Sequence, residues 1–458
     1  MTRPILICML ALVTLGGCAA IGGATGQLVL RERCLALERR ALEDNEAMAI
    51  LRSLVTTAPK RLAGSPGMHT AEQWAMAQMR AIGFDDVRAE SVMVPNWQRG
   101  IETGWTVQPN SMPLRVTALG GSVATPAGGI EAEVVEVRSF EQLQAMGDAA
   151  KGKIIFFNRP MPRALRRTGS AYGAAVPQRS NGAIETAKAG GVLALVRSVT
   201  TAIDGYPHTG AMNYADGIAK VPAAAVATED ADALSQMLAN GPVTVRLELG
   251  CETLPDVEGF NIVGDYRGSA IPDEIVLIGA HLDAWDLGTG AHDDGAGVTH
   301  CLEAVRLLKA IGCRPHRTIR VVLFANEENG LRGAKAYGAA HEHEMEKHVA
   351  AIETDGGGAT PQGFSCSLRG AEAAAIETLF EPLDQINAGL FLSGAGAGGA
   401  DISVLHARGV PCFGLWVDGH RYFDYHHTAV DDLPAVNERE LALGAAVVAY
   451  AASVLADR

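Results

Sequence analysis

The chain of 458 residues lacks several features that mark whole classes of protein. It has no Cys-x-x-Cys pair among its eight cysteines, which argues against a thiolate zinc site and a thioredoxin-type dithiol. It also has no excess of basic residues, because 52 acidic residues outnumber 38 basic ones and give a formal net charge of -14. Nucleic-acid binding needs a surface rich in Lys and Arg, so the composition argues against that function.

The apolar run at residues 5–15 is too short to cross a bilayer, which takes about 20 residues. Such a run followed by small residues is typical of a signal peptide. The segment Leu15-Gly16-Gly17-Cys18 resembles a bacterial lipobox, so we predict a signal peptide over residues 1–18 and a lipid on Cys18. The alternative is plain secretion with cleavage near Ala19 or Ala20. In both cases we expect an exported protein, either secreted or held in the cell envelope or periplasm as a lipoprotein.

Length and local patterns predict an α/β protein with more than one domain. Residues 34–111 form the first part of the main domain, with helical periodicity up to residue 82 and a strand at residues 87–94. Residues 112–250 carry several short strand signals and end in the alternating segment VTVRLEL, which predicts an inserted β-rich domain. Residues 251–458 alternate strands with helices and complete the main domain.

The last part of the chain contains the residues that point to chemistry. Buried strands are predicted at residues 275–280, 319–325, 349–352 and 410–417, and helices at residues 296–311 and 436–455. Acidic or histidine side chains follow every one of these strands, and another acidic segment precedes the first helix: His281 and Asp283, Asp293, Glu327 and Glu328, Asp355, and His427. Ligand sites in α/β sheets lie beyond the carboxyl ends of strands.

So many carboxylates at one edge of a sheet would repel each other unless a cation neutralised them. Imidazole with carboxylate, and without thiolate, suits catalytic zinc. His281, Asp355, Glu328 and His427 can give each of two metals a pair of ligands, and Asp293 can bridge them. Glu327 is then free to act as a base, and Asp283 is suited to orient the His281 ring. Spacing alone does not fix this division of roles.

Four segments together resemble the M28 family of zinc peptidases: RLAGSP at residues 61–66, PNWQRG at 95–100, YPHTG at 206–210, and the run from 281 to 297. The resemblance covers nearly the whole mature chain. It implies a mixed sheet between helices, an inserted protease-associated domain, two zinc ions per chain and a homodimer.

The resemblance also implies individual roles. It assigns His281 and Asp355 to one zinc ion, Glu328 and His427 to the other, Asp293 to the bridge and Glu327 to the general base. His427 is preferred over His426 because the family pattern His-Thr/Ser-x-x-Asp is completed by Asp431. The implied function is an exopeptidase acting on small peptides, of the dipeptidase or aminopeptidase type.

Two other functions remain open on this basis. One is a non-catalytic binding ectodomain on the same fold, which the complete ligand set disfavours. The other is a related zinc enzyme such as a glutaminyl cyclase. Such enzymes resemble proteins with a mononuclear site and lack the inserted domain, so this sequence fits them poorly.

Three further patterns favour simpler interpretations. His341, His343 and His348 lie in an acidic run that predicts a solvated, charged helix. Residues 394–399 match a dinucleotide-binding glycine pattern but lack a strand–helix–strand frame, so we expect a loop near the substrate pocket. His208 is a candidate for substrate contact, with a satisfied surface or interface histidine as the alternative.

Overall fold

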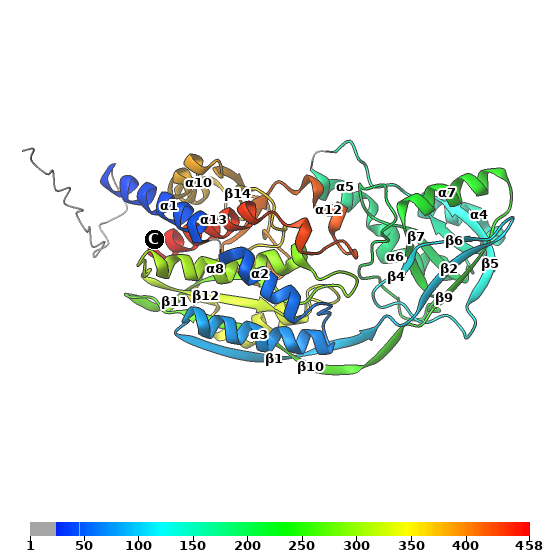
Figure 1. Cartoon of the computed structure of the whole chain (residues 1–458), viewed down its shortest axis with the longest axis horizontal. Helices are drawn as coiled ribbons and strands as arrows, with labels where there is room; N and C mark the ends of the chain where they lie inside the picture. The colour runs from blue at the N-terminus through cyan, green and yellow to red at the C-terminus, as the bar shows by residue number, and fades with distance from the viewer. Residues whose placement is uncertain (1–23, 45, 166) are drawn as a thin grey trace, which may run out of the picture.

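The structure, a computed structural model, describes residues 24–44, 46–165 and 167–458. The predicted signal peptide and Cys18 lie outside these residues. Two eight-stranded sheets form two units, joined by the long antiparallel ribbon of β1 (Asp86–Gln98) and β10 (Glu252–Tyr266). Figure 1 shows this ribbon leading along the bottom of the first unit into the second. The strand expected at residues 87–94 is longer than predicted, because it continues past Pro95 through an irregularity in register between Val94 and Asn96.

The first sheet is mixed, as predicted. Its strands lie in the order β1, β10, β12 (Arg317–Phe324), β11 (Ile271–His281), β13 (His348–Glu353), β16 (Cys412–Val417), β14 (Pro361–Cys366), β15 (Leu390–Ser393). The four central strands, β12, β11, β13 and β16, run parallel. Their carboxyl ends therefore meet at one edge of the sheet, where the sequence places its acidic and histidine residues.

Helices cover both faces of this sheet. One face packs against α1 (Ala24–Asp44), α2 (Glu46–Thr57), α3 (Pro66–Ile82), α8 (Ala296–Ala310) and α13 (Glu438–Asp457). The other face packs against α9 (Arg332–Ala340) and α11 (Ser403–His406). The helical segment expected up to residue 82 is divided, since Ser65 caps the N-terminus of α3 and Pro66 occupies its first turn. Gly83 ends α3 in the left-handed conformation, as predicted.

Helix α13 is long and apolar enough to cross a membrane by composition. However, 94% of its apolar window is buried inside the fold. It contacts α8 and several strands of the first sheet, and its apolar side chains belong to the largest core cluster. It is therefore the central core helix of the first unit, and it matches the helix predicted at residues 436–455.

The second unit contains the second sheet, in the order β3 (Met112–Pro113), β2 (Glu102–Gln108), β9 (Thr244–Leu249), β5 (Ile130–Val137), β6 (Ile154–Phe157), β7 (Leu193–Arg197), β8 (Ala223–Val226), β4 (Val116–Ala118). The sheet includes β2, which precedes residue 112, because β2 pairs with both β3 and β9. The unit is also less β-rich than expected. Its described residues contain four α-helices: α4 (Phe140–Met146), α5 (Thr168–Ala175), α6 (Pro177–Lys188) and α7 (Thr228–Asn240).

The remaining elements are short or peripheral: α10 (Gly370–Phe380), α12 (Tyr422–Tyr425), the π-helical turn η2 (Ala291–Gly295), and the 3-10 turns η1 (Gly147–Ala150), η3 (Glu342–Lys347), η4 (Glu381–Ile386), η5 (Gly419–Arg421) and η6 (Leu433–Ala435). The solvated helix predicted around His341 is wrong. The segment folds as the short turn η3, and only His343 of its three histidines is exposed. His341 and His348 are buried, because they pair with acidic and aromatic groups of neighbouring elements.

Candidate metal centre

The predicted site residues converge at the carboxyl edge of the first sheet. His281 ends β11, and Glu327 and Glu328 lie in the turn after β12. Asp355 follows β13, and His427 follows α12. Asp293 lies in η2, at the entrance to α8. Residues up to 146 positions apart in the sequence are therefore brought together by the parallel arrangement of the central strands.

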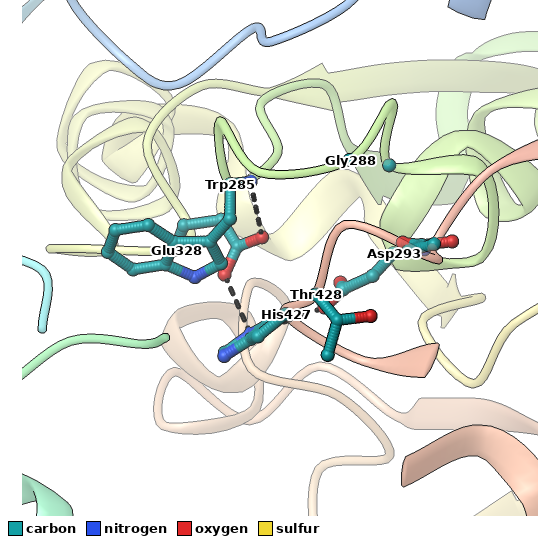
Figure 2. A pocket seen from close by; sticks show the side chains of 8 residues that line it. Trp285, Gly288, Asp293, Glu328, His427 and Thr428 are labelled. Carbon is teal, nitrogen blue, oxygen red and sulfur yellow. Dashed lines mark hydrogen bonds and ion pairs between the residues drawn. The ribbon is translucent and has the colours of Figure 1, made fainter. Parts of the chain in front are cut away.

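Asp293 occupies the centre of this group, and its two carboxylate oxygens face different partners. Oδ1 lies 3.1 Å from His281 Nε2, which itself lies 3.7 Å from Asp355 Oδ1. Oδ2 lies 3.3 Å from His427 Nε2, which itself lies 3.1 Å from Glu328 Oε2. Figure 2 shows the second of these pairs, with the Glu328 carboxylate between Trp285 and His427. The site thus has two halves that share one aspartate.

The backbone around Asp293 is fixed by Asp431. The Asp431 carboxylate accepts hydrogen bonds from the backbone N–H groups of His292, at 2.7 Å, and Asp293, at 3.1 Å. The next residue, Asp294, accepts from the backbone N–H groups of His281 and Gly297. These contacts tie η2 to the end of β11 and to the first turn of α8. The position of the shared aspartate is therefore set by two other carboxylates, which bind backbone N–H groups.

Arg61 is a structural residue of the site that sequence reasoning did not assign. It is fully buried, and its guanidinium donates to the backbone carbonyls of Leu282, at 2.6 Å, Gly290, at 2.8 Å, and Thr289. A buried cation that binds three carbonyls of one loop holds that loop in a single conformation. The RLAGSP segment was the available signal, but a family resemblance alone does not say what its arginine contacts.

Asp283 contacts the His281 ring through its backbone and not through its carboxylate. The His281 ring is oriented by the backbone carbonyl of Asp283, which lies 3.0 Å from Nδ1, whereas the nearest Asp283 carboxylate oxygen lies 3.8 Å away. That carboxylate instead accepts a hydrogen bond of 3.0 Å from the backbone N–H of Glu327. Asp283 therefore supports both the His281 ring and the turn that carries Glu327.

His426 and His427 both lie beside Asp293, with their rings stacked at a centroid distance of 3.5 Å. His426 Nε2 lies 3.6 Å from Asp293 Oδ2, which is farther than His427 Nε2. His427 also contacts Glu328, and its Nδ1 lies 3.3 Å from the Thr209 carbonyl oxygen. The geometry therefore favours His427 as the partner of Glu328 and leaves His426 as a neighbour.

The site carries more negative charge than its bases can balance. Burial, together with the charge of Asp293, raises the pKa of Glu328 to about 7. Burial raises the pKa of Asp431 to about 7 and that of Glu327 well above its ordinary value. Burial opposes the charge of His427, but Glu328 and Asp293 outweigh it and raise its pKa to about 10. Burial is the main cause of the raised pKa values of the carboxylates, whereas the neighbouring carboxylates raise the pKa of His427.

These residues fit a metal centre. Asp293 Oδ2 is buried and has no hydrogen bond of adequate geometry, although His427 lies within ion-pair distance. Ligand atoms of His281, Asp293 and Asp355 lie within 4.8 Å of one another, and so do those of Asp293, His426 and His427. Imidazole and carboxylate ligands of this kind suit zinc. A cavity of about 10 Å³, with room for about one water molecule, opens beside Asp293, Glu328 and His427.

Two other sequence interpretations can be compared with the structure. The glycine-rich loop at residues 394–399 packs against Glu353, whose carboxylate accepts from the backbone N–H groups of Asp401 and Ile402. A buried acid at this loop is the opposite of what a phosphate needs. His208 is buried against the backbone of His426, but neither ring nitrogen has the geometry of a hydrogen bond. It is therefore not a satisfied surface histidine.

Comparison with known proteins identifies the family. Residues 261–452 match the profile of Peptidase family M28. Carboxypeptidase Q of Mus musculus is 36% identical over 415 residues, which cover 90% of this chain and 86% of that protein. Carboxypeptidase Q of Homo sapiens is 35% identical over 414 residues, with the same coverage. The chain belongs to peptidase family M28.

Solved structures agree with this assignment. A Peptidase M28 precursor from Shewanella amazonensis has a TM-score of 0.90 and 39% identity, covering 94% of this M28 peptidase and 97% of that chain. A zinc aminopeptidase from Bacillus subtilis shares the fold, with a TM-score of 0.65 and 19% identity over 89% of this chain and 93% of its own. The protein is a peptidase of this family with a mixed α/β fold, as the sequence predicted.

Proposed function

We propose that this M28 peptidase is a di-zinc exopeptidase that hydrolyses small peptides. The observation that carries the proposal is the division of the Asp293 carboxylate, with Oδ1 toward His281 and Oδ2 toward His427. His281 and Asp355 would hold one zinc ion, Glu328 and His427 the other, and Asp293 would bind both. When bound, zinc would supply a Lewis acid for the scissile carbonyl and would lower the pKa of the attacking water.

Glu327 is proposed as the general base. Its backbone N–H is held by Asp283, and its carboxylate lies beside the ligand set without a hydrogen bond to any proposed ligand among the described residues. Burial disfavours its ionised form, which makes the carboxylate a better proton acceptor when it is charged. Glu327 would take a proton from the attacking water and then deliver it to the leaving amine. Asp283 would act as a positioning residue for both Glu327 and His281.

The site has space for the attacking water of the proposed reaction. Room for about one water molecule lies between Trp285, Thr428 and the proposed ligands. The second unit, which we propose to be a protease-associated domain inserted over about residues 112–250, lies against the same site through Thr209. Relatives named carboxypeptidase and aminopeptidase, both exopeptidases, are consistent with removal of terminal residues. We further propose a homodimer, as the family resemblance implies.

We also propose export of the protein, with a signal peptide ending at Cys18. The sequence before Cys18 supports lipid attachment at that residue, and therefore a location in the cell envelope. Mass spectrometry of the mature N-terminus tests this proposal. A lipid-modified Cys18 is the expected result, and an unmodified N-terminus at Ala19 or beyond would leave simple secretion.

The function is tested by zinc content and substrate choice together. Elemental analysis of gently purified protein should give about two zinc ions per chain. The loaded protein should cleave members of a panel of dipeptides and aminoacyl amides, and a chelator should abolish cleavage until zinc is restored. A folded protein that binds two zinc ions and cleaves no peptide would favour a binding ectodomain instead. A fully active protein without metal would overturn the proposal.

A further inference from the structure

The two halves of the proposed metal centre are supported by different parts of the molecule. In the first half, the His281 ring is oriented by the backbone carbonyl of Asp283. The backbone N–H of His281 donates to the Asp294 carboxylate. Both contacts come from the first unit, close to His281 in sequence. The second half, Glu328 and His427, has contacts with the second unit that the first half lacks among the described residues.

His427 is held by two contacts with the loop at residues 206–210 of the second unit. The backbone N–H of Thr209 donates to the His427 carbonyl at 3.0 Å, and His427 Nδ1 lies 3.3 Å from the Thr209 carbonyl oxygen. A carbonyl can only accept, so Nδ1 must carry the proton in this contact. This contact leaves Nε2, which faces Glu328 and Asp293, as the nitrogen available to a metal ion. Gly210 allows this approach, because a side-chain Cβ there would lie 2.7 Å from His427 Nδ1.

Glu328 is reached by the second unit through Trp285. The backbone N–H of Trp285 donates to Glu328 Oε1 at 3.2 Å, as Figure 2 shows. The indole ring lies against the rings of His427, at 5.7 Å, and Trp97, at 6.4 Å. Its far end fills the space beside Gly120, where a Cβ would come within 1.8 Å of the ring. Gly120 of the second unit therefore packs against Trp285, the residue whose backbone N–H binds Glu328.

The segment that contacts His427, residues 206–210, and the segment that packs against Trp285, residues 118–120, are hydrogen-bonded to each other. Gly120 donates its backbone N–H to the Gly210 carbonyl at 2.9 Å, and Thr209 Oγ1 donates to the Ala118 carbonyl at 2.8 Å. Arg99 donates to Thr209 Oγ1 at 3.3 Å and to both carboxylate oxygens of Asp286. Asp286 follows Trp285 directly, so one network fixes the support of both Glu328 and His427.

We propose that residues 118–120 and 206–210 of the second unit are a positioning element for one zinc ion only, the one assigned to Glu328 and His427. The proposal rests on the proposed di-zinc function. It gives the second unit a role in metal binding although none of the proposed ligands lies in it. Disrupting this element should lower the affinity for the zinc ion assigned to Glu328 and His427. The affinity for the ion assigned to His281 and Asp355 should stay unchanged.

The primary test uses Gly120→Ala and Gly210→Ala, with Gly169→Ala as the matched control. Gly169 is exposed on α5, and a Cβ there would meet nothing within 4 Å. Zinc titrations against a competing chelator should resolve two affinities in the wild type. Loss of a contact that orients a ligand costs about 10- to 100-fold in metal affinity. We expect that loss for one ion in both variants, and no change for Gly169→Ala.

A gentler variant keeps the test valid if the glycine variants fold poorly. Thr209→Val retains the side-chain shape but removes the hydroxyl that binds Ala118 and Arg99. It should weaken the same zinc ion, and cobalt-loaded protein should show an altered absorption spectrum for one site only. In a His427→Gln background the effect of Thr209→Val should disappear, whereas in a His281→Gln background it should persist.

The outcomes separate this inference from the proposed function. A wild-type protein that binds fewer than two zinc ions would overturn the proposed function and the inference with it. A wild-type protein with two zinc ions, whose affinities fall together or not at all in folded Gly120→Ala and Thr209→Val variants, would overturn only the inference.

Discussion

Two clusters of histidine and acidic residues lie on the first sheet, and their charge balance differs. The candidate metal centre at the carboxyl edge contains buried carboxylate oxygens without hydrogen bonds, namely Oδ2 of Asp283 and Oδ2 of Asp293, and both oxygens of the nearby Asp401 also have none. The second cluster, which we call the His341 cluster, joins β1, β10, β12, α9 and η3. In it, every acidic group faces a base: Asp265, Glu90 and Glu344 against Arg88, Arg320 and His341.

The pairing in the His341 cluster is close and directional. Arg320 binds both carboxylate oxygens of Asp265, at 2.7 and 3.0 Å. His341 binds Glu344 through Nδ1 at 2.6 Å and Glu90 through Nε2 at 3.0 Å. Tyr337 links the group to His348 at 2.8 Å. A cluster that satisfies its own charges needs no ion, whereas one with unpaired buried carboxylates is stable only with a cation or added protons.

The comparison shows why residue type alone does not identify a site. Both clusters contain histidines and carboxylates, and both are largely buried. What differs is the number of bases for each acid and the presence of oxygens without partners. Each variant below should therefore disturb one cluster and spare the other.

The largest effect is expected for Glu327→Gln. The substitution removes the proposed base but none of the proposed ligands, so zinc content and stability should remain near those of the wild type. The turnover number should fall by about 10²- to 10⁴-fold, the usual contribution of a positioned acid–base group. Steady-state kinetics with a cleaved dipeptide, alongside zinc analysis, measures this. Near-normal turnover with two zinc ions bound would mean that the base lies elsewhere.

Asp293→Asn should weaken both zinc ions, since each depends on one oxygen of this carboxylate. We expect a loss of more than about 10²-fold in affinity for each, because even the loss of a group that only orients a ligand costs about 10- to 100-fold. His427→Ala should weaken mainly one ion. Zinc titration of the two variants checks the difference, and equal losses of both ions in His427→Ala would contradict the division of the site.

Arg320→Met tests the His341 cluster. Removing the cation takes away the bidentate partner of the partly buried Asp265 and leaves only Arg88 beside it, which should cost about 1.5–3 kcal/mol of unfolding free energy. Zinc affinity and turnover should not change. The control is Arg408→Met, whose partner Glu342 is mostly exposed, and which should cost no more than about 1 kcal/mol. Denaturant unfolding measures both, and a loss of zinc in Arg320→Met would mean that the clusters are not independent.

The sequence predicted much of the metal centre because its residues follow strand ends. His281, Glu328 and Asp355 come directly after hydrophobic segments, and parallel strands bring such residues to one edge. The central strands and the core helices α8 and α13 were predicted for the same reason, since their apolar periodicity is strong.

The remaining features depend on contacts between distant segments. The support of His427 by Thr209 spans 218 residues and uses backbone atoms, which have no signature in residue type. The same holds for Arg61, which binds three carbonyls of a loop more than 220 residues away. The burial of His341 was missed because its partner Glu90 is 251 residues away on β1, while its local sequence resembles a solvated helix.

The smallest effect concerns the pH dependence of the His341 cluster. Burial opposes the charge of His341, but hydrogen bonds to Glu90 and Glu344 outweigh it and raise the pKa of His341 above its ordinary value. The same bonds outweigh burial and lower the pKa values of Glu90 and Glu344. Arg320 and His348 also face this group, and Arg320 acts against the charge of His341.

The sign of the pH effect follows from these directions. The raised pKa of His341 gives stability that is fully present below about pH 6.5, its ordinary pKa, and is lost as pH rises through the folded value. The lowered pKa values of the two glutamates give stability that is lost on acidification below about pH 4.5. His341→Gln should therefore cost about 1.5 kcal/mol between about pH 5 and 6, and less at higher pH. Unfolding of wild type and variant across this range measures the difference, with His343→Gln, at an exposed position, as the control. A cost that stays constant up to pH 10 would mean that His341 contributes by packing alone, and the charge balance that separates the two clusters would then not include it.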